Sequence, residues 1–386
     1  MYISKIQARN WKNFSRFEIN MGEMVYLLGP NASGKSNFLD IFRFMRDIVN
    51  PSGGGLQHAL NIRHGLKKIR CLAARRDPQL ELSFEFKESL RAEESDFEWR
   101  YVIGINQEGS GKRRPMVVKE EVYKGRKLIL ERPNTEDKND KERLTATYLE
   151  QVNMNREFRC IAEYFQDVLY LHLVPQLLKY NNELSSRKLE SDPFGQGFLD
   201  EIAKTPTKSR TARLRHIQKI LHEVIPHFEE LRFVQDDTGR PHLEMRYAHW
   251  RPNAGWQRED QFSDGTLRLI AIIWLLLSNN SMILLEEPEF SLHRKIVEQI
   301  PKLIYGAKQY IRKPSGQLII STHSEALLSD KSIDACYMIL KPGTPGESTS
   351  VEIPSEDDYK ALMSGLSPAD VLLAKTGESI GYIKNG

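Results

Sequence analysis

Residues 24–42, MVYLLGPNASGKSNFLDIF, decide the fold. An apolar run stops at a loop of small residues, and apolar side chains then return at helical spacing. The loop from Gly29 to Ser36 fits the pattern G-x-x-x-x-G-K-[ST], and both flanks, a strand and an amphipathic helix, match the context that this motif requires. Glycines allow successive backbone N–H groups to curl into a nest, and the positive end of the helix dipole points the same way. The stretch therefore predicts a polyphosphate-binding loop between a strand and a helix.

The residues predicted to contact the nucleotide lie in and just after this loop: Gly29, Asn31, Ala32, Ser33, Gly34, Lys35, Ser36 and Asn37. Lys35 is expected to pair with the β- and γ-phosphates, and the Ser36 hydroxyl is expected to ligate Mg²⁺. ATP and Mg²⁺ are accordingly the predicted cofactors. An ordinary glycine-rich turn is the alternative, but it does not account for a match of the motif together with both flanks.

Composition bounds the class of protein. The chain has 386 residues, 40% of them hydrophobic, which is enough for two or three domains with a large core. No apolar stretch reaches about 18 residues and the N-terminus alternates polar and apolar residues, so neither a membrane span nor a secretion signal is predicted. The net charge of +3 does not by itself indicate nucleic acid. Cys71, Cys160 and Cys336 lack metal-ligand spacing, so a reducing, cytoplasmic location is expected.

The hydrophobic pattern divides the chain into segments. Alternation predicts a hairpin over residues 1–20 and a largely antiparallel sheet with strands at 80–86, 97–105, 116–123 and 128–131. A charged loop at 132–145 marks a boundary, residues 146–228 have a helical pattern, and a second hairpin is expected to turn at 237–239. The predicted domains are an N-terminal lobe with the antiparallel β subdomain (1–134), a helical insertion (135–228), a C-terminal lobe (229–345) and a C-terminal tail (346–386).

A second buried strand, residues 282–285, ends in the carboxylates Glu286 and Glu287. At a strand end beside a phosphate loop, Glu286 is expected to orient Mg²⁺ through its water shell, and Glu287 to polarise the water that attacks the γ-phosphate. Two surface glutamates after a buried strand are the alternative. The position of this acid-bearing strand relative to the phosphate loop favours the catalytic interpretation.

A third apolar strand, residues 318–321, is followed by His323, at the end where α/β sheets keep their ligand crevice. Its imidazole is predicted to sense the γ-phosphate, and a structural histidine is the alternative. Between these strands, Ser263, Asp264 and Gly265 precede a long apolar helix. This turn presents N–H groups and a hydroxyl at a helix start and predicts a second anion site, while simple N-capping by Ser263 is the alternative.

Taken in order, GPNASGKS, FSDGT, MILLEEPE, the following SLH and IISTHS resemble the motifs of ABC-type ATPases of the RecF, SMC and overcoming-lysogeny-defect group. The opening IQARNWKNFSRFEI also resembles the start of these proteins. The likeness is closest to the ATPase half of the overcoming-lysogeny-defect proteins and to stand-alone ATPases of bacterial anti-phage systems, and it covers residues 1–60 and 255–340. It implies an α/β, ABC-type P-loop ATPase fold with a mixed sheet, an antiparallel β subdomain and a helical insertion.

In that family the FSDGT turn is the signature that contacts the γ-phosphate held by the opposite subunit. The resemblance therefore implies a head-to-tail homodimer with ATP between its subunits. Ser263 and Gly265 would act in trans, and Leu292 and His293 would lie along the dimer seam.

Two features depart from the family pattern. The first acid of the metal strand is usually Asp and here is Glu286, whose longer reach still supports a water-mediated contact with Mg²⁺. A glutamine expected at the metal site is matched only weakly by Gln57, for which a solvated loop amide is the alternative. Full-length overcoming-lysogeny-defect proteins also carry a nuclease module. The acids after His323, among them residues 356–358 in an expected solvated turn, do not match it, so any nuclease is expected to be a separate polypeptide.

Basic residues gather in three stretches of the sequence. They are Lys67, Lys68, Arg70, Arg75 and Arg76; Lys112, Arg113 and Arg114; and, on a predicted helix, Arg210, Arg213, Arg215 and Lys219. No base-reading motif accompanies them, so any contact with DNA is expected to be independent of sequence. Solvated surfaces are the alternative for each stretch.

The leading hypothesis is an ATPase whose ATP-bridged dimer gates a nucleic-acid-directed assembly, in anti-phage defence with a separately encoded nuclease or toxin. The alternative is a RecF-like DNA repair or chromosome-maintenance ATPase that binds DNA without sequence specificity. The nucleotide subunit of a membrane transporter is disfavoured by the long middle insertion and by SDGT in place of a Gly-Gly signature.

Overall fold

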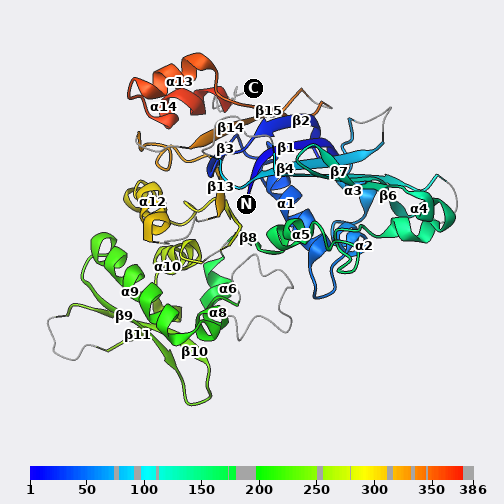
Figure 1. Ribbon diagram of the computed structural model, residues 1–386. Coiled ribbons are helices and arrows are strands. Elements are labelled where there is room, and N and C mark those ends of the chain that lie inside the picture. The colour runs from blue at the N-terminus through cyan, green and yellow to red at the C-terminus, as the bar shows by residue number, and fades with distance from the viewer. Residues whose placement is uncertain are drawn as a thin grey trace, which may run out of the picture.

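The computed structural model describes residues 1–73, 78–90, 97–109, 113–172, 174–179, 197–249, 255–278, 280–310, 316–331, 335–344 and 347–376. Its centre is a six-stranded sheet (Figure 1). In spatial order the strands are β15 (Ser350–Glu352), β14 (Cys336–Lys341), β3 (Met24–Leu28), β13 (Gln317–Thr322), β12 (Met282–Glu286) and β8 (Val168–Leu171). All neighbours are parallel except β14 and β15. The carboxyl ends of β3, β13, β12 and β8 therefore meet at one edge.

Strand β3 serves two hydrophobic cores, because consecutive strand residues face opposite sides of a sheet. Val25 and Leu27 belong to one buried cluster, whereas Met24, Tyr26 and Leu28 belong to the other. A sheet that is covered on both faces requires apolar residues at nearly every strand position. This explains why the sequence before the phosphate loop is a continuous apolar run.

The first core is formed by one face of the central sheet, two helices and an antiparallel sheet. The helices are α1 (Lys35–Val49) and α5 (Arg159–Gln166), with the short α2 (Leu56–Asn61) and α3 (Leu66–Ile69) beside them. The antiparallel sheet has the order β2–β1–β4–β5–β6–β7. Its strands are β1 (Tyr2–Trp11), β2 (Phe14–Asn20), β4 (Leu80–Lys87), β5 (Trp99–Gln107), β6 (Pro115–Lys124) and β7 (Lys127–Arg132).

The second core covers the other face of the central sheet. It is built chiefly by α10 (Asp264–Leu276) and α12 (Ile300–Tyr310), with α8 (Phe198–Lys204) and α9 (Thr207–Val224). A small sheet of β9 (Phe228–Gln235), β10 (Pro241–Tyr247) and β11 (Gln257–Arg258) closes it, and Figure 1 shows this sheet at the opposite end of the view from the antiparallel sheet. The connecting elements are α6 (Pro175–Lys179), η2 (Glu259–Gln261) and α11 (Arg294–Val297).

The last described residues return to the central sheet and then form a small helical unit. Strand β15 pairs with β14, so the predicted tail contributes a strand to the sheet. Helices α13 (Glu356–Met363) and α14 (Pro368–Leu372) and the turn η3 (Leu373–Thr376) follow. The backbone N–H of Thr349 donates to the carbonyl of Asn13 at 2.8 Å, which fastens this segment to the turn between β1 and β2.

The predicted fold class is confirmed, with a mixed sheet, an antiparallel sheet and a largely helical middle segment. The expected strands and both hairpins are present, with ends that differ by a few residues. The domain boundaries stay predictions.

Three details of the prediction are wrong. The helical pattern over 146–228 concealed strand β8. The charged loop at 132–145 instead forms α4 (Thr135–Asn139) and η1 (Lys141–Thr145), because Arg132 is buried against Glu120 and Asp137 and draws the segment onto β6. The acids at 356–358 begin α13, since Asp358 and Ser355 form a capping box.

Candidate nucleotide site

The phosphate loop connects β3 to α1 through backbone conformations that favour glycine. Gly34 is the N-cap of α1 with φ of 102°, and Ala32 lies in the left-handed region at 63°. The ammonium group of Lys35 donates hydrogen bonds to the carbonyls of Gly29 at 2.8 Å and Pro30 at 3.1 Å. The lysine is thus folded over the loop and buried, where a phosphate would exchange with these carbonyls.

Ser33 lies at the bottom of the loop. Its side chain is fully buried, and its hydroxyl finds no hydrogen-bond partner among the described residues. A buried polar group without a partner costs free energy, and such an orphan beside a nest of backbone N–H groups fits a site that receives a polar ligand.

Glu286 comes from the tip of β12, and the Ser36 hydroxyl from the start of α1 donates to its Oε1. Its other oxygen, Oε2, accepts a hydrogen bond from the hydroxyl of Tyr170 on β8. A hydroxyl and a carboxylate are hard oxygen donors of the kind that Mg²⁺ prefers. No group of three His, Cys, Asp or Glu side chains in the described ranges forms a metal site, so a Mg²⁺ held here would fill its remaining positions with phosphate and water oxygens.

Glu287 has a strained backbone, with φ of 45°. Its N–H donates to the carbonyl of Ser321 on β13 at 3.0 Å, and its Oε1 lies 3.5 Å from Nδ1 of His323. The residue following β12 is thereby tied to the neighbouring strand. The tips of β12 and β13 bring Glu287 and His323 together, and the catalytic roles of both residues stay predictions.

Behind these residues lies a supporting group that the sequence did not suggest. Thr322 donates to Oε1 of Glu289 at 2.6 Å, and burial raises the pKa of the Glu289 carboxyl. Arg268, buried on α10, donates to the carbonyl of Phe290 at 2.7 Å and to that of Glu287 at 3.4 Å. Burial lowers the pKa of its guanidinium. Helix α10 is thus hydrogen-bonded to the loop that follows the catalytic glutamate candidate.

The FSDGT turn forms the start of α10. The Ser263 hydroxyl accepts from the N–H of Thr266 at 3.1 Å, so it caps the helix as the alternative interpretation predicted. Lys179 and Gln176 of α6 bind the Asp264 carboxylate at 2.7 and 2.9 Å. A Cβ on Gly265 would lie 3.2 Å from the carbonyl oxygen of Ser291.

The segment after β12 passes close to this turn. The side chain of Leu292 also lies 3.2 Å from the Cβ position of Gly265. His293 accepts a hydrogen bond from the N–H of Lys295 at 3.3 Å and caps α11. Both residues therefore adjoin the turn within one chain, and their place along a dimer seam stays a prediction.

A family model matches residues 24–329, and its description is "AAA domain, putative AbiEii toxin, Type IV TA system". The chain belongs to this AAA family. Its fold is that of the SMC head. One similar solved structure is the "SmcHead bound to the C-winged helix domain of ScpA", with a TM-score of 0.55 and 14% identity over 94% of this chain and 100% of that one. Another is the Smc head domain from Pyrococcus yayanosii, with a TM-score of 0.50 and 13% identity over 94% and 99%.

The AAA-family match and the SMC-head fold confirm an ABC-type ATPase of the RecF/SMC group. A search of curated proteins gave no match. Among the described residues, the helices are too short or too polar to span a bilayer.

Gln57 of this ATPase does not join the predicted metal residues. On α2, its amide nitrogen donates to the carbonyls of Pro115 at 3.0 Å and Thr145 at 2.8 Å. The side chain therefore fastens α2 to β6 and η1. Another amide, that of Gln176, follows β8 at the carboxyl edge of the sheet and donates to the Asp264 carboxylate. Only the position of β8, absent from the sequence interpretation, could have revealed it.

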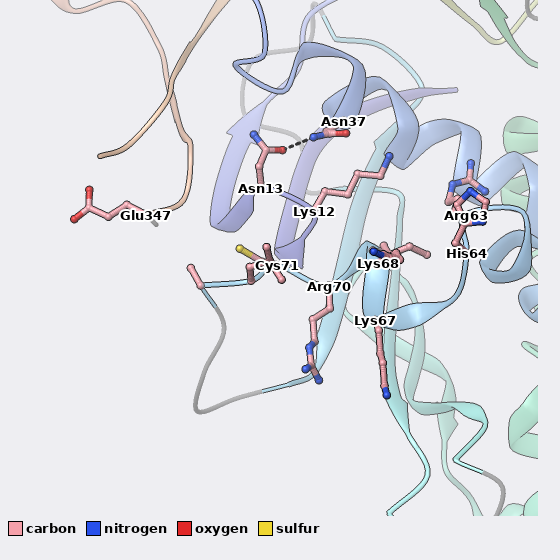
Figure 2. A pocket seen from close by; sticks show the side chains of 13 residues that line it. Lys12, Asn13, Asn37, Arg63, His64, Lys67, Lys68, Arg70, Cys71 and Glu347 are labelled. Atoms are coloured by element: carbon pink, nitrogen blue, oxygen red, sulfur yellow. Dashed lines mark hydrogen bonds between the residues drawn. The ribbon is translucent and has the colours of Figure 1, made fainter. Parts of the chain in front are cut away.

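A basic pocket of about 700 Å³ lies beside the start of α1 (Figure 2). Its polar and charged lining residues are Lys12, Asn13, Asn37, Arg63, His64, Lys67, Lys68, Arg70 and Glu347. Lys12 and Arg63 pair with Asp40 of α1 at 2.7 and 2.8 Å. In contrast, Lys67, Lys68 and Arg70 form no ion pair with any described residue, so their charge is available to an anionic ligand.

The pocket is connected to the phosphate loop by amide side chains. Asn37 donates to Oδ1 of Asn13 at 2.8 Å, the bond drawn in Figure 2. Asn13 in turn donates to the carbonyl of Ser33 at 3.0 Å and to the hydroxyl of Thr349 at 2.8 Å. Asn13 and Asn37 therefore both line the pocket, and Asn13 contacts the phosphate loop at the same time.

The other basic stretches do not join this pocket. Arg114 pairs with Glu142 at 2.6 Å near the antiparallel sheet. On α9, Arg210 and Arg213 stack on the rings of Phe233 and Trp274, and Figure 1 shows that helix far from α3. Arg75, Arg76 and Lys112 lie outside the described residues.

Proposed function

We propose that this chain binds ATP with Mg²⁺ in the phosphate loop and hydrolyses it. The observation that carries the proposal is the meeting of the Ser36 hydroxyl with Glu286, next to Glu287 and His323. One loop and two strand tips thus supply a phosphate nest, oxygen ligands for a metal, a candidate base and a candidate γ-phosphate sensor.

The geometry supports a role for each of these residues. Lys35 would exchange the carbonyls of Gly29 and Pro30 for β- and γ-phosphate oxygens. Ser36 and Glu286 would hold Mg²⁺, which when bound neutralises charge on the phosphates. Glu287 would accept a proton from the attacking water. Its peptide is fixed from two sides, by Ser321 and by Arg268, which keeps the carboxylate in place as charge develops.

We infer further that two copies enclose the nucleotide head to tail. In this arrangement the Ser263–Gly265 turn of one copy meets the γ-phosphate held by Lys35 of the other. Ser263, which is exposed just before α10, supports this, as does Phe290, which is 63% exposed three residues after Glu287. An exposed aromatic residue next to a catalytic loop suits a protein contact.

The proposed role is an ATP-gated assembly directed at nucleic acid, most specifically anti-phage defence with a separately encoded nuclease or toxin, in the cytoplasm. The family description, which names a toxin of a toxin–antitoxin system, supports defence. A RecF-like repair or chromosome-maintenance role is the alternative. The basic pocket favours a phosphate backbone as partner in either case, because its described lining residues include five basic side chains but no Phe, Tyr or Trp ring for base stacking.

Two variants and one control test the ATPase proposal. Lys35→Ala should abolish nucleotide binding, and Glu287→Gln should retain binding but reduce phosphate release by about 10²- to 10⁴-fold. Lys138→Ala, an exposed lysine on α4, is the control and should behave as wild type. Nucleotide binding by Lys35→Ala at wild-type affinity would refute the assignment of the loop.

Ser263→Arg tests the dimer separately. It should retain nucleotide affinity in the single subunit but prevent the rise in sedimentation coefficient with a non-hydrolysable ATP analogue. Dimers that form normally in this variant would exclude the turn from the interface.

DNA contact at the pocket is tested by the double variant Lys67→Ala/Lys68→Ala. Fluorescence anisotropy with a DNA duplex should show weaker binding, and the slope of log affinity against log salt should fall by about one for each lost phosphate contact. The control is Lys138→Ala/Lys141→Ala, on exposed lysines of α4 and η1. Equal affinity for both double variants would remove the pocket from the DNA-binding surface.

A further inference from the structure

Glu286 is anchored by a residue that no motif includes. Tyr170 lies on β8, the edge strand next to β12, in register with Leu284. Residues two apart on a strand share a face, so the tyrosine side chain reaches along β12 to Glu286. Its hydroxyl donates to Oε2, the oxygen that Ser36 does not contact.

Tyr170 is itself held firmly. Its side chain is 6% exposed, and the guanidinium of Arg43 on α1 lies 4.2 Å from the centre of its ring. Arg43 is in turn 3.7 Å from the Asp40 carboxylate. The phenol hydroxyl of a tyrosine is a hydrogen-bond donor at neutral pH.

The contact with Tyr170 matters because this chain has a glutamate, Glu286, at a position where an aspartate is usual. A glutamate has one more rotatable bond than an aspartate, and a carboxylate that must orient a metal has to be fixed in one rotamer. A Ser36 hydroxyl that ligates a metal through a lone pair still carries its proton, but it approaches Glu286 from the phosphate loop, on the side where the metal would lie. Tyr170 can keep Oε2, because it approaches from the sheet and not from the phosphate loop.

We propose that Tyr170 is a positioning residue for the Mg²⁺ site, which holds Oε2 of Glu286 so that Oε1 faces the metal and thereby compensates for the longer glutamate side chain. The inference rests on the proposed ATP and Mg²⁺ site. Tyr170 acts only through Glu286 and touches neither substrate nor metal.

The test is a Mg²⁺ titration of nucleotide binding, measured with a fluorescent non-hydrolysable ATP analogue. In EDTA, Tyr170→Phe should bind the analogue as the wild type does. With Mg²⁺, its half-saturating concentration should rise about 10-fold or more, the usual effect of removing an outer-shell partner of a metal ligand. Tyr164→Phe is the matched control, because Tyr164 is also buried but gives its hydroxyl to Gln317 in the core. It should leave the Mg²⁺ titration unchanged.

A second background isolates the route through Glu286. In Glu286→Asp, the carboxylate is one methylene shorter and no longer meets Tyr170, so adding Tyr170→Phe should change the half-saturating Mg²⁺ concentration less than twofold. An equal effect in both backgrounds, or no effect in the wild-type background, would overturn the proposal. If wild-type protein binds the analogue without any response to Mg²⁺, the proposed metal site itself fails, and this inference fails with it.

Discussion

Replacing Gly34 by alanine tests the structure of the phosphate loop most directly. The added Cβ would lie 2.1 Å from Nδ2 of Asn13 and 2.8 Å from its Cγ and Oδ1, so Asn13 must move. The asparagine makes three side-chain hydrogen bonds, with Ser33, Thr349 and Asn37. The φ of 102° at Gly34 adds backbone strain for any residue with a Cβ.

The expected cost can be divided into these two parts. Losing three hydrogen bonds at about 0.5–1.5 kcal/mol each gives roughly 1.5–4.5 kcal/mol. The backbone strain adds about 1–3 kcal/mol. Gly53→Ala is the matched control, because Gly53 has φ of 100° but no atom within 4 Å of its Cβ position. It should show the strain alone.

Equilibrium urea denaturation of the two variants measures the difference in the free energy of unfolding. We expect Gly34→Ala to be less stable than Gly53→Ala by about 1.5–4.5 kcal/mol, the part of the cost that comes from the lost hydrogen bonds. In the Asn13→Ala background the clash is gone, so Gly34→Ala should cost no more than Gly53→Ala. The reasoning is refuted if Gly34→Ala costs the same with and without Asn13.

Three further outcomes are expected. Arg132→Met removes the guanidinium that pairs with the buried carboxylates of Glu120 and Asp137 and leaves Asp137 only the longer contact with Arg143 at 3.5 Å. It should lower the free energy of unfolding by about 3–5 kcal/mol, whereas Arg114→Met at a partly exposed pair should cost about 0–1 kcal/mol. Similar urea midpoints for the two variants would contradict this. Burial would raise the pKa of the Asp40 carboxyl, but the hydrogen bond and charge of Arg63 lower it overall. As the pH falls, Asp40 is therefore protonated in the unfolded chain at a higher pH than in the folded protein. The free energy of unfolding should fall as the pH drops below about 4. Asp40→Asn should flatten this acid limb in urea titrations from pH 3 to 7, and an unchanged limb would exclude Asp40 as its source. Ser33→Ala removes a buried hydroxyl without a partner, so the free energy of unfolding should stay within about 1 kcal/mol of wild type while nucleotide affinity falls. Isothermal titration calorimetry measures the affinity. An unchanged affinity would show that this hydroxyl does not contact the ligand.

The sequence predicted those parts of the fold whose signal is local. The phosphate loop, the alternating strands of the antiparallel sheet and the acids after β12 each carry their pattern within a few residues. Strand β8 was not predicted, because its four residues, VLYL, are too short to alternate and adjoin the helical pattern of α5.

The contacts that complete the candidate site were beyond prediction for a different reason. Tyr170 and Glu286 are 116 residues apart, and their meeting depends on β8 pairing with β12. In the sequence, Arg268 is simply a charged residue in an apolar helix. Only the structure shows that it binds the carbonyls of the loop after β12. Gln57 was chosen for its place in the chain order, whereas its position in space is set by the carbonyls of the antiparallel sheet.

The bond between Asn13 and Thr349 joins residues 336 positions apart, just outside the phosphate loop. The turn between β1 and β2 and the segment before β15 are therefore joined beside this loop, although they lie near opposite ends of the chain. If the loop binds a nucleotide as proposed, cutting the backbone near Glu347 should break this junction and speed nucleotide release, even though the segment before β15 carries no nucleotide-binding motif.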